Sequence, residues 1–289
     1  MTHLTSTRSC STLSDPKNWT DFQLNELTPK PFGDLDVDIK IQACGVCASD
    51  LFTTSGGCGE QHCPLRAGHD DNERLCRHQL DTCGARWPDP GIIFPGRLTR
   101  RPTNRVFHIP DGLPTSKAAP LLCAGLTGCS SLGRNSAGAR KRPDITGMSG
   151  IGHLGLLSSK ALCAGTDWDR GWDREHIMKS DLIVCMASST EGMDPGAYLQ
   201  SLDVHGRFVG VASPEGSGQR VFFGGGGSHL GSKKEALAML QLAVDKGVDS
   251  WVEEMKTSKE GLKEALARVQ SNDVRYRFTI NGYEDVYGA

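Results

Sequence analysis

The pattern of hydrophobic and polar residues changes several times along the first half of the chain. Residues 35–43 (LDVDIKIQA) alternate between apolar and polar positions, as a half-buried β-strand does. Residues 107–114 (FHIPDGLP) predict the end of a strand followed by a turn, because Pro and Asp-Gly favour turns. Residues 118–132 (AAPLLCAGLTGCSSL) predict a buried helix, whereas residues 56–105 carry little periodicity.

The second half alternates between short apolar runs and helical patterns. Residues 143–164 predict a strand, a glycine-rich turn and a helix, and residues 181–189 and 206–213 predict buried strands. Asp194 is a predicted N-cap with Pro195 in the first turn, and Gly247 is a predicted helix end. Strands separated by helices predict a parallel α/β sheet. The remaining predicted helices cover residues 194–204, 232–247 and 258–273, and a last strand covers 274–280.

Composition narrows the class of protein. The chain has 289 residues, enough for one large or two medium domains, and its 32 basic and 34 acidic residues nearly balance. No global charge therefore points to nucleic acid or to a membrane surface, and the apolar runs are too short to span a bilayer. The N-terminal stretch lacks the apolar core of a secretory signal, so we expect the 11 cysteines to be reduced thiols or metal ligands in the cytosol.

The glycine turn between the strand and the helix of residues 143–164 has the context of a dinucleotide-binding fingerprint. Gly147 would make the tight turn, and Gly152 would let the helix pack closely on the strand. Ser149 stands where a glycine usually lets the backbone approach a pyrophosphate, and Gly150 beside it keeps the loop permissive. A plain strand–turn–helix corner explains the same pattern. The strand, helix and strand that should follow in a doubly wound sheet are missing from the sequence.

The stretch ACGVCASD places Cys44 and Cys47 three residues apart. Such a pair fits a redox dithiol, half of a structural zinc site, one ligand of a catalytic metal, or two ordinary thiols. No second pair with that spacing follows, which disfavours structural zinc, and a preceding strand disfavours a redox dithiol. Catalytic zinc needs three scattered ligands, and the other candidates are Cys58, Cys63, His69, Asp70, Cys76, Cys83 and Cys123.

Several candidates have a structural explanation as well. Cys123 in an apolar helix is typical of a small core residue, and His108 and His153 stand alone in apolar segments. Arg275 and Arg277 could contact a phosphate, although charged residues on a strand are usually solvated.

Together these segments resemble the zinc-containing medium-chain alcohol dehydrogenases, in particular their NADP-dependent cinnamyl-alcohol-type branch. The resemblance implies a partial GroES-like β catalytic domain at residues 1–124 and 228–289. It also implies a partial Rossmann-like doubly wound parallel sheet at 125–227, without its second and third strands. The matching stretches are KPFGDLDVDIKIQACGVCASD, AGHD, FHIPDGLP, AAPLLCAGLT, ITGMSGIGHLG, DLIVCMASS, GSHLGSKKE, WVEEM and NDVRYRFTINGY, in the order of the family.

The resemblance implies a catalytic zinc and NADP as cofactors, with a small alcohol or aldehyde as substrate and a homodimer as the assembly. Ser49 takes the place of the hydroxyl that relays the alcohol proton, and Asp50 that of an acid supporting the metal. The metal ligands carried over are Cys47, His69 and Cys123, with Asp70 in place of the usual glutamate. The cofactor contacts carried over are Thr127, Gly147, Ser149, Gly150, Ile151, Gly152, Gly210, Ser228, His229, Leu230 and Arg275.

The sequence departs from the family at three places. Phe52 replaces the family's histidine near the relay hydroxyl, and Cys76 alone remains of the four structural-zinc cysteines, so no structural zinc is expected. The gap after the fingerprint helix removes the segment that binds the adenosine ribose. Two alternatives to a working dehydrogenase follow: a non-catalytic remnant, or a zinc-binding interaction protein without productive NADP binding.

Overall fold

The computed structural model describes most of the chain, and it divides the chain into two compact units. The first unit combines residues 1–123 with 250–289, and the second unit consists of residues 124–249. The described residues are 7–12, 20–28, 31–55, 70–72, 75–77, 98–102, 106–163, 178–187, 193–211, 226–228 and 230–287.

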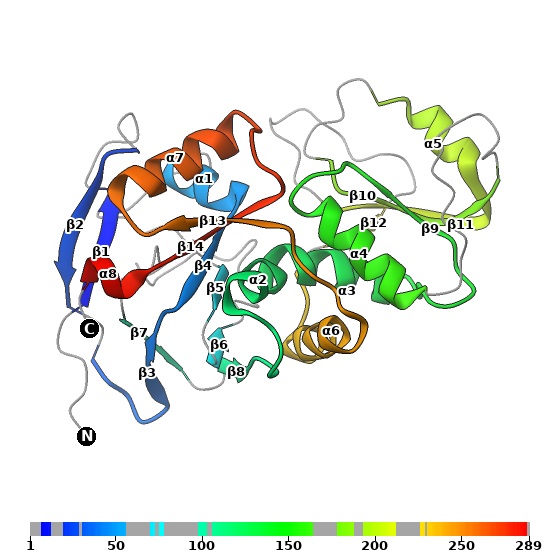
Figure 1. Ribbon diagram of the computed structural model, residues 1–289. Helices are drawn as coiled ribbons and strands as arrows, with labels where there is room; N and C mark the ends of the chain where they lie inside the picture. Colours follow the sequence, from blue (N-terminus) through cyan, green and yellow to red (C-terminus); the bar gives the residue numbers. More distant parts are fainter. Residues whose placement is uncertain are drawn as a thin grey trace. The chain divides into compact units, whose positions relative to one another are not determined.

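The first unit is built on a four-stranded mixed sheet with the order β13-β14-β4-β5 (Figure 1). β14 runs parallel to β13 and antiparallel to β4, and β4 pairs antiparallel with β5. Three strand pairs complete its described β-structure: β1 with β2, β3 with β7, and β6 with β8. The strands are β1 Thr7–Thr12, β2 Phe22–Leu27, β3 Asp36–Lys40, β4 Ala43–Val46, β5 Asp70–Asn72, β6 Leu75–Arg77, β7 Leu98–Pro102, β8 Val106–His108, β13 Val252–Lys256 and β14 Arg277–Asn281.

Helices cover this sheet and bury its apolar side chains. Ser258 caps α7, since its Oγ accepts the N–H of Gly261 at 2.8 Å. Leu262 and Leu266 of α7 are one helical turn apart, and both lie in the core with Phe278 of β14. The helices of the unit are α1 Ala48–Thr54, α2 Thr115–Pro120, α7 Lys259–Gln270 and α8 Tyr283–Tyr287.

The second unit contains a four-stranded parallel sheet with the order β12-β11-β10-β9. Ile183 and Val184 of β10 belong to apolar clusters on opposite faces of the sheet, because neighbouring side chains of a strand point to opposite sides. The elements are α3 Leu126–Arg134, β9 Pro143–Thr146, α4 Gly152–Leu162, β10 Ser180–Cys185, α5 Pro195–Ser201, β11 Leu202–Gly210, β12 Gly226–Gly227 and α6 Lys233–Lys246.

Among the described strands, β9 pairs only with β10 and forms one edge of the sheet. A complete doubly wound sheet continues past its first strand with a second and a third strand. The described sheet agrees with the prediction that these two strands are missing. The predicted parallel α/β order of this half of the chain is confirmed.

Arg142 joins the starts of three parallel strands. Its backbone N–H and its Nε donate to Oδ2 of Asp181 at 2.9 and 3.2 Å, and its Nη2 donates to Oδ2 of Asp203 at 2.6 Å. The pKa of Asp203 is lowered first by the backbone N–H of Val204 and then by the Arg142 guanidinium. Arg142, directly before β9, therefore bonds to acidic side chains of both β10 and β11.

The predicted helix start at Asp194 and helix end at Gly247 agree with the structure, and two predicted helices differ in extent. The predicted helix of residues 194–204 ends at Ser201, because Leu202 begins β11. The Asp194 carboxylate accepts the N–H groups of Gly196 and Ala197, and Gly247 closes α6 with φ 65°. The predicted helix of residues 118–132 is split into α2, the π-helix η3 (Leu121–Gly125) and α3. Pro120 lacks an amide N–H, which removes an intrahelical hydrogen bond next to this wider turn.

The compact units differ from the expected domains at one end. The first unit's opening segment ends at residue 123, one residue before the expected limit. The second unit extends to residue 249, because α6 packs against α3 and α4. We had placed residues 228–289 in the catalytic domain. The expected domain limits stay a prediction. Within the part of the chain that the structure describes, no helix has the length and apolarity needed to cross a membrane.

Candidate functional site

Cys47 lies where β4 ends and α1 begins, and it caps that helix. Its Sγ accepts the N–H of Ser49 at 3.2 Å, and its own N–H donates to Oδ2 of Asp50 at 2.8 Å. These two bonds form a capping box, with the cysteine in the role usually taken by serine or threonine. An N–H aimed at sulfur favours the thiolate, which is the form that binds metals.

Asp50 and Ser49 differ in their exposure. The Asp50 side chain is almost fully buried and holds the backbone of Cys47, so it orients the thiol through the main chain. Ser49 is exposed, which leaves its hydroxyl accessible from outside the unit. The structure therefore brings together Cys47, Ser49 and Asp50 in one helical turn. Their predicted metal and proton-relay roles stay predictions.

Cys44 is separated from this turn by its place in β4. Its side chain is fully buried in the core of the first unit, and its Sγ donates to the carbonyl of Gly45 at 3.4 Å. Neither Cys44 nor Cys47 forms a disulfide among the described residues. A buried thiol with an internal partner is typical of a core residue.

Of the other expected metal ligands, Asp70 lies on a strand that pairs with β4. Asp70 opens β5, where its backbone pairs with Gly45, and α2 packs on both β4 and β5. Cys123 lies half-buried in η3, immediately after α2, and His69 lies outside the described residues. Among the described side chains no group of three histidines, cysteines or acids is close enough to hold a metal. The zinc ligand set stays a prediction.

Arg277 shows that one of our alternatives was wrong. We expected the arginines of this strand to be solvated, but Arg277 is buried in β14. Its Nη1 donates to the carbonyl of Val46 at 3.3 Å, directly before Cys47. Sequence patterns gave no signal for this contact, because the register of β14 against β4 decides it.

The turn between β9 and α4 requires glycine at two positions. Gly147 has φ 82°, and a Cβ there would lie 2.4 Å from the backbone nitrogen of Ala187. A Cβ on Gly152 would lie 1.9 Å from the carbonyl oxygen of Gly147. The tight turn and the close helix packing that the fingerprint predicts are both present.

The hydroxyl of Ser149 in the glycine loop accepts two backbone amides at the start of α4. Its Oγ lies 3.3 Å from the backbone nitrogens of Ile151 and Gly152, and it donates to the carbonyl of Met186 at 3.4 Å. Gly150 lies between the serine and these amides in the chain. The substitution of glycine by serine was visible in the sequence, but the occupied amides were not.

The remaining described cofactor candidates of the second unit lie mainly at the carboxyl edge of the sheet. Gly210 ends β11 beside β12, and the N–H of Ser228 donates to the Gly210 carbonyl at 3.1 Å. The turn after β9 lies at this same edge, because all four strands are parallel. In open α/β sheets ligands bind at this edge. Thr127 is buried in α3, where its carbonyl accepts the Ser131 hydroxyl at 2.7 Å.

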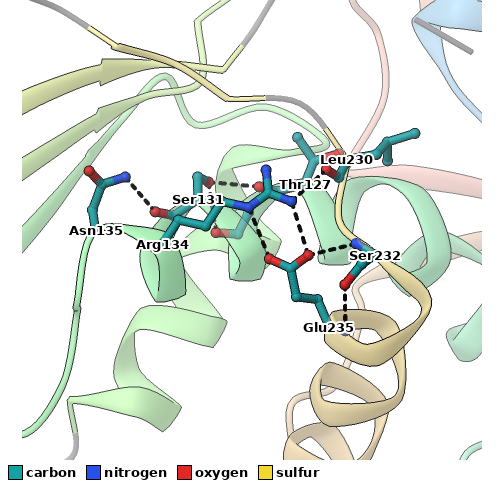
Figure 2. Close-up of polar contacts among 8 residues, drawn as sticks. Thr127, Ser131, Arg134, Asn135, Leu230, Ser232 and Glu235 are labelled. Atoms are coloured by element: carbon teal, nitrogen blue, oxygen red, sulfur yellow. Dashed lines mark hydrogen bonds and ion pairs between the residues drawn. The ribbon is translucent and has the colours of Figure 1, made fainter. Parts of the chain in front are cut away.

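An ion pair between α3 and α6 fixes the segment between β12 and α6 (Figure 2). The Arg134 guanidinium meets the Glu235 carboxylate at 2.9 and 3.0 Å and also donates to the Leu230 carbonyl at 3.2 Å. The same carboxylate accepts the N–H of Ser232 at 2.6 Å. Burial opposes ionisation of Glu235, but these donors outweigh it and lower its pKa to about 2.

We call this group of Arg134, Leu230, Ser232 and Glu235 the α3–α6 clamp. Our sequence expectations did not include Arg134 or Glu235. The spacing of Ser232 and Glu235 is that of a capping box, which was the sequence signal available for these two members of the clamp.

Arg275 belongs to the first unit, is exposed, and donates its backbone N–H to Glu253 at 3.2 Å. Its cofactor role stays a prediction, and His229 lies outside the described residues.

Comparison with known proteins decides the family. No family model matches the chain. The NADP-dependent alcohol dehydrogenase 6 of Saccharomyces cerevisiae is 31% identical over 341 residues, covering 93% of this chain and 94% of that protein. The chain belongs to the medium-chain alcohol dehydrogenase family.

Solved structures of this family share the fold. A cinnamyl alcohol dehydrogenase of Sorghum bicolor matches with a TM-score of 0.79 and 21% identity over 96% of this chain and 97% of its own. The CAD protein of Helicobacter pylori, complexed with NADP(H), matches with a TM-score of 0.77 and 17% identity over 96% and 98%. These likenesses confirm the predicted fold class, with partial GroES-like and Rossmann-like parts.

The length of the match confirms that this dehydrogenase family member is shortened inside the chain. The match with the yeast enzyme spans 341 positions, more than the 289 residues of the whole chain. Segments of the relative therefore have no counterpart here. In the described sheet of the second unit, β9 lies at the edge.

Proposed function

We propose that the protein is a zinc-dependent oxidoreductase that transfers a hydride between NADP(H) and a primary alcohol or aldehyde. The observation that carries the proposal is the match to an NADP-dependent alcohol dehydrogenase over 93% of the chain. The glycine turn at the carboxyl edge of a parallel sheet supports it, since that is where a dinucleotide binds.

The sequence offers the kinds of side chain that bind a catalytic zinc. Two cysteines and a histidine form the donor set of zinc alcohol dehydrogenases, and Cys47, His69 and Cys123 supply these types here. The N–H of Ser49 on the Cys47 sulfur favours the charged form that a metal needs. We propose Asp70 as an acid at the same site. When bound, zinc polarises the alcohol oxygen and lowers the pKa of the alcohol.

The chain's own residues would bind, orient and relay a proton. We propose that Asp50 positions the Cys47 ligand and that the exposed Ser49 hydroxyl accepts the proton of the substrate alcohol. Because Phe52 replaces a histidine of the family, that proton would pass from Ser49 to water. We propose the cofactor contacts named above for the second unit, and Arg275 for the pyrophosphate. A cytosolic location is proposed from the reduced thiols expected from the sequence. A homodimer is proposed from the family resemblance alone.

Titration with NADPH and measurement of zinc test the proposal together. We expect saturable binding, followed by nicotinamide fluorescence, and about one zinc per chain by elemental analysis. The matched pair Cys47→Ser and Cys44→Ser separates ligand loss from general damage, because only the first should lose zinc and turnover. Zinc without NADPH binding would refute the oxidoreductase and leave the zinc-binding interaction protein. If the unchanged protein binds neither zinc nor NADPH, the result would favour the non-catalytic remnant. No described contact favours that alternative.

A further inference from the structure

The hydroxyl of Ser149 occupies the amides that a dinucleotide would need. Its Oγ lies 3.3 Å from the nitrogens of Ile151 and Gly152, at the start of the 11-residue helix α4. Backbone N–H groups at such a helix start bind phosphate when a glycine-rich loop lets the phosphate approach. In this chain the same N–H groups already have an acceptor from within the loop.

The serine also adds bulk at the position of closest approach. The middle glycine of the fingerprint serves to let the backbone come near the pyrophosphate. Ser149 brings a Cβ and a hydroxyl to this position, and the donation of that hydroxyl to the Met186 carbonyl at 3.4 Å orients it over the loop. The loop backbone is tightly packed beside it, since an added Cβ would lie 2.4 Å from backbone atoms at Gly147 and 1.9 Å at Gly152.

The occupying bonds are weak enough to be replaced. N–H···O bonds are commonly 2.9–3.0 Å long, and those to Ser149 are 3.3 Å. A pyrophosphate oxygen is charged, and charged acceptors bind amides about twice as strongly as neutral ones. Binding would therefore have to displace the hydroxyl, at a cost that the glycine of the fingerprint avoids.

We propose that Ser149 is an internal competitor of the cofactor pyrophosphate and sets a reduced affinity for NADP(H) in this chain. The inference rests on the proposed function, since it presumes that this loop receives the cofactor. It extends that function by naming the residue that determines how tightly the dinucleotide is held.

Three variants test the proposal in the full-length protein loaded with zinc. Ser149→Ala removes the hydroxyl, Ser149→Gly removes the Cβ as well, and Ser201→Ala removes a serine hydroxyl that donates to Tyr198 in α5, in the same unit. We expect NADPH to bind about 3- to 10-fold more tightly to Ser149→Ala, and Ser149→Gly to gain at least as much. Inorganic pyrophosphate should compete better in the same order, and Ser201→Ala should bind as the unchanged chain does.

Thermal unfolding without ligand separates this role from a structural one. Ser149→Ala loses the bonds from the Ile151 and Gly152 amides, so its melting temperature should fall while its affinity for NADPH rises. If Ser149 is purely structural, Ser149→Ala should lower both the melting temperature and the NADPH affinity. If its hydroxyl donates to the phosphate, Ser149→Ala should weaken NADPH binding. Either result would overturn the inference alone. If the unchanged chain and all variants bind no NADPH, the proposed function falls, and the inference falls with it.

Discussion

The α3–α6 clamp allows a prediction of how stability depends on pH. Glu235 has an ordinary pKa of 4.5 and a folded-state pKa of about 2. A pKa that is lowered by folding stabilises the folded state above the unfolded value, and this stabilisation is lost as the pH falls from about 4.5 towards 2. The perturbation is Glu235→Gln, which keeps the shape of the side chain and removes its charge.

The magnitude follows from the shift and the exposure of the pair. At about 1.4 kcal/mol for each pKa unit, the shift of Glu235 sets a ceiling of roughly 3 kcal/mol. The Glu235 side chain is 30% exposed and that of Arg134 44%, so solvent screens the pair. We therefore expect Glu235→Gln to lower the free energy of unfolding by about 1–2 kcal/mol at pH 7.

Urea unfolding followed by circular dichroism at a series of pH values measures this effect. The difference between the unchanged chain and Glu235→Gln should be constant above pH ~5 and shrink steadily below pH ~4.5. Arg134→Lys serves as the second variant, because it keeps the positive charge and loses the two-pronged geometry. We expect it to lose part of the stability that Glu235→Gln loses. A Glu235→Gln variant as stable as the unchanged chain at pH 7, or a difference that does not change with pH, would refute the reasoning.

Three further predictions follow from the described residues. Gly152→Ala should destabilise the second unit by about 2–3 kcal/mol in urea unfolding, because its Cβ would overlap the Gly147 carbonyl. The control Gly133→Ala meets open space, so it should be neutral or slightly stabilising. Asp194→Ala should cost about 1 kcal/mol through loss of the α5 cap, and unchanged stability would contradict that cap. Burial raises the pKa of the Cys129 thiol to about 11, so Cys129 should resist iodoacetamide at pH 8 in the folded protein and react on unfolding, as peptide mass spectrometry would show.

The sequence predicted the second unit well because its signals are local. Asp194 lies at the helix start that its carboxylate predicts, and Gly247 lies at the helix end that its tolerance of a positive φ predicts. Both determine structure within a few neighbouring residues. The glycine turn was likewise predictable, since only glycine tolerates the φ of Gly147. The short strands β10 and β11 followed from apolar runs between helices.

The features that the sequence left open depend on contacts between distant segments. The burial of Arg277 follows from the pairing of β14 with β4, and the clamp joins Arg134 to Glu235 across 101 positions. The split of the predicted helix at Pro120 was signalled by the proline, but the π-helix that follows it was not. The set of expected metal ligands came from the family resemblance. The capping role of the Cys47 thiol emerged only from the structure.

The edge strand β9 has a consequence for association between copies of the chain. A sheet edge with unpaired amides is a template on which another strand can add, and natural proteins blunt such edges with short strands and proline. β9 has four residues and begins with Pro143, which has no amide hydrogen to donate. The shortened sheet therefore offers few donors at this described edge, and loss of neighbouring strands need not lead to aggregation.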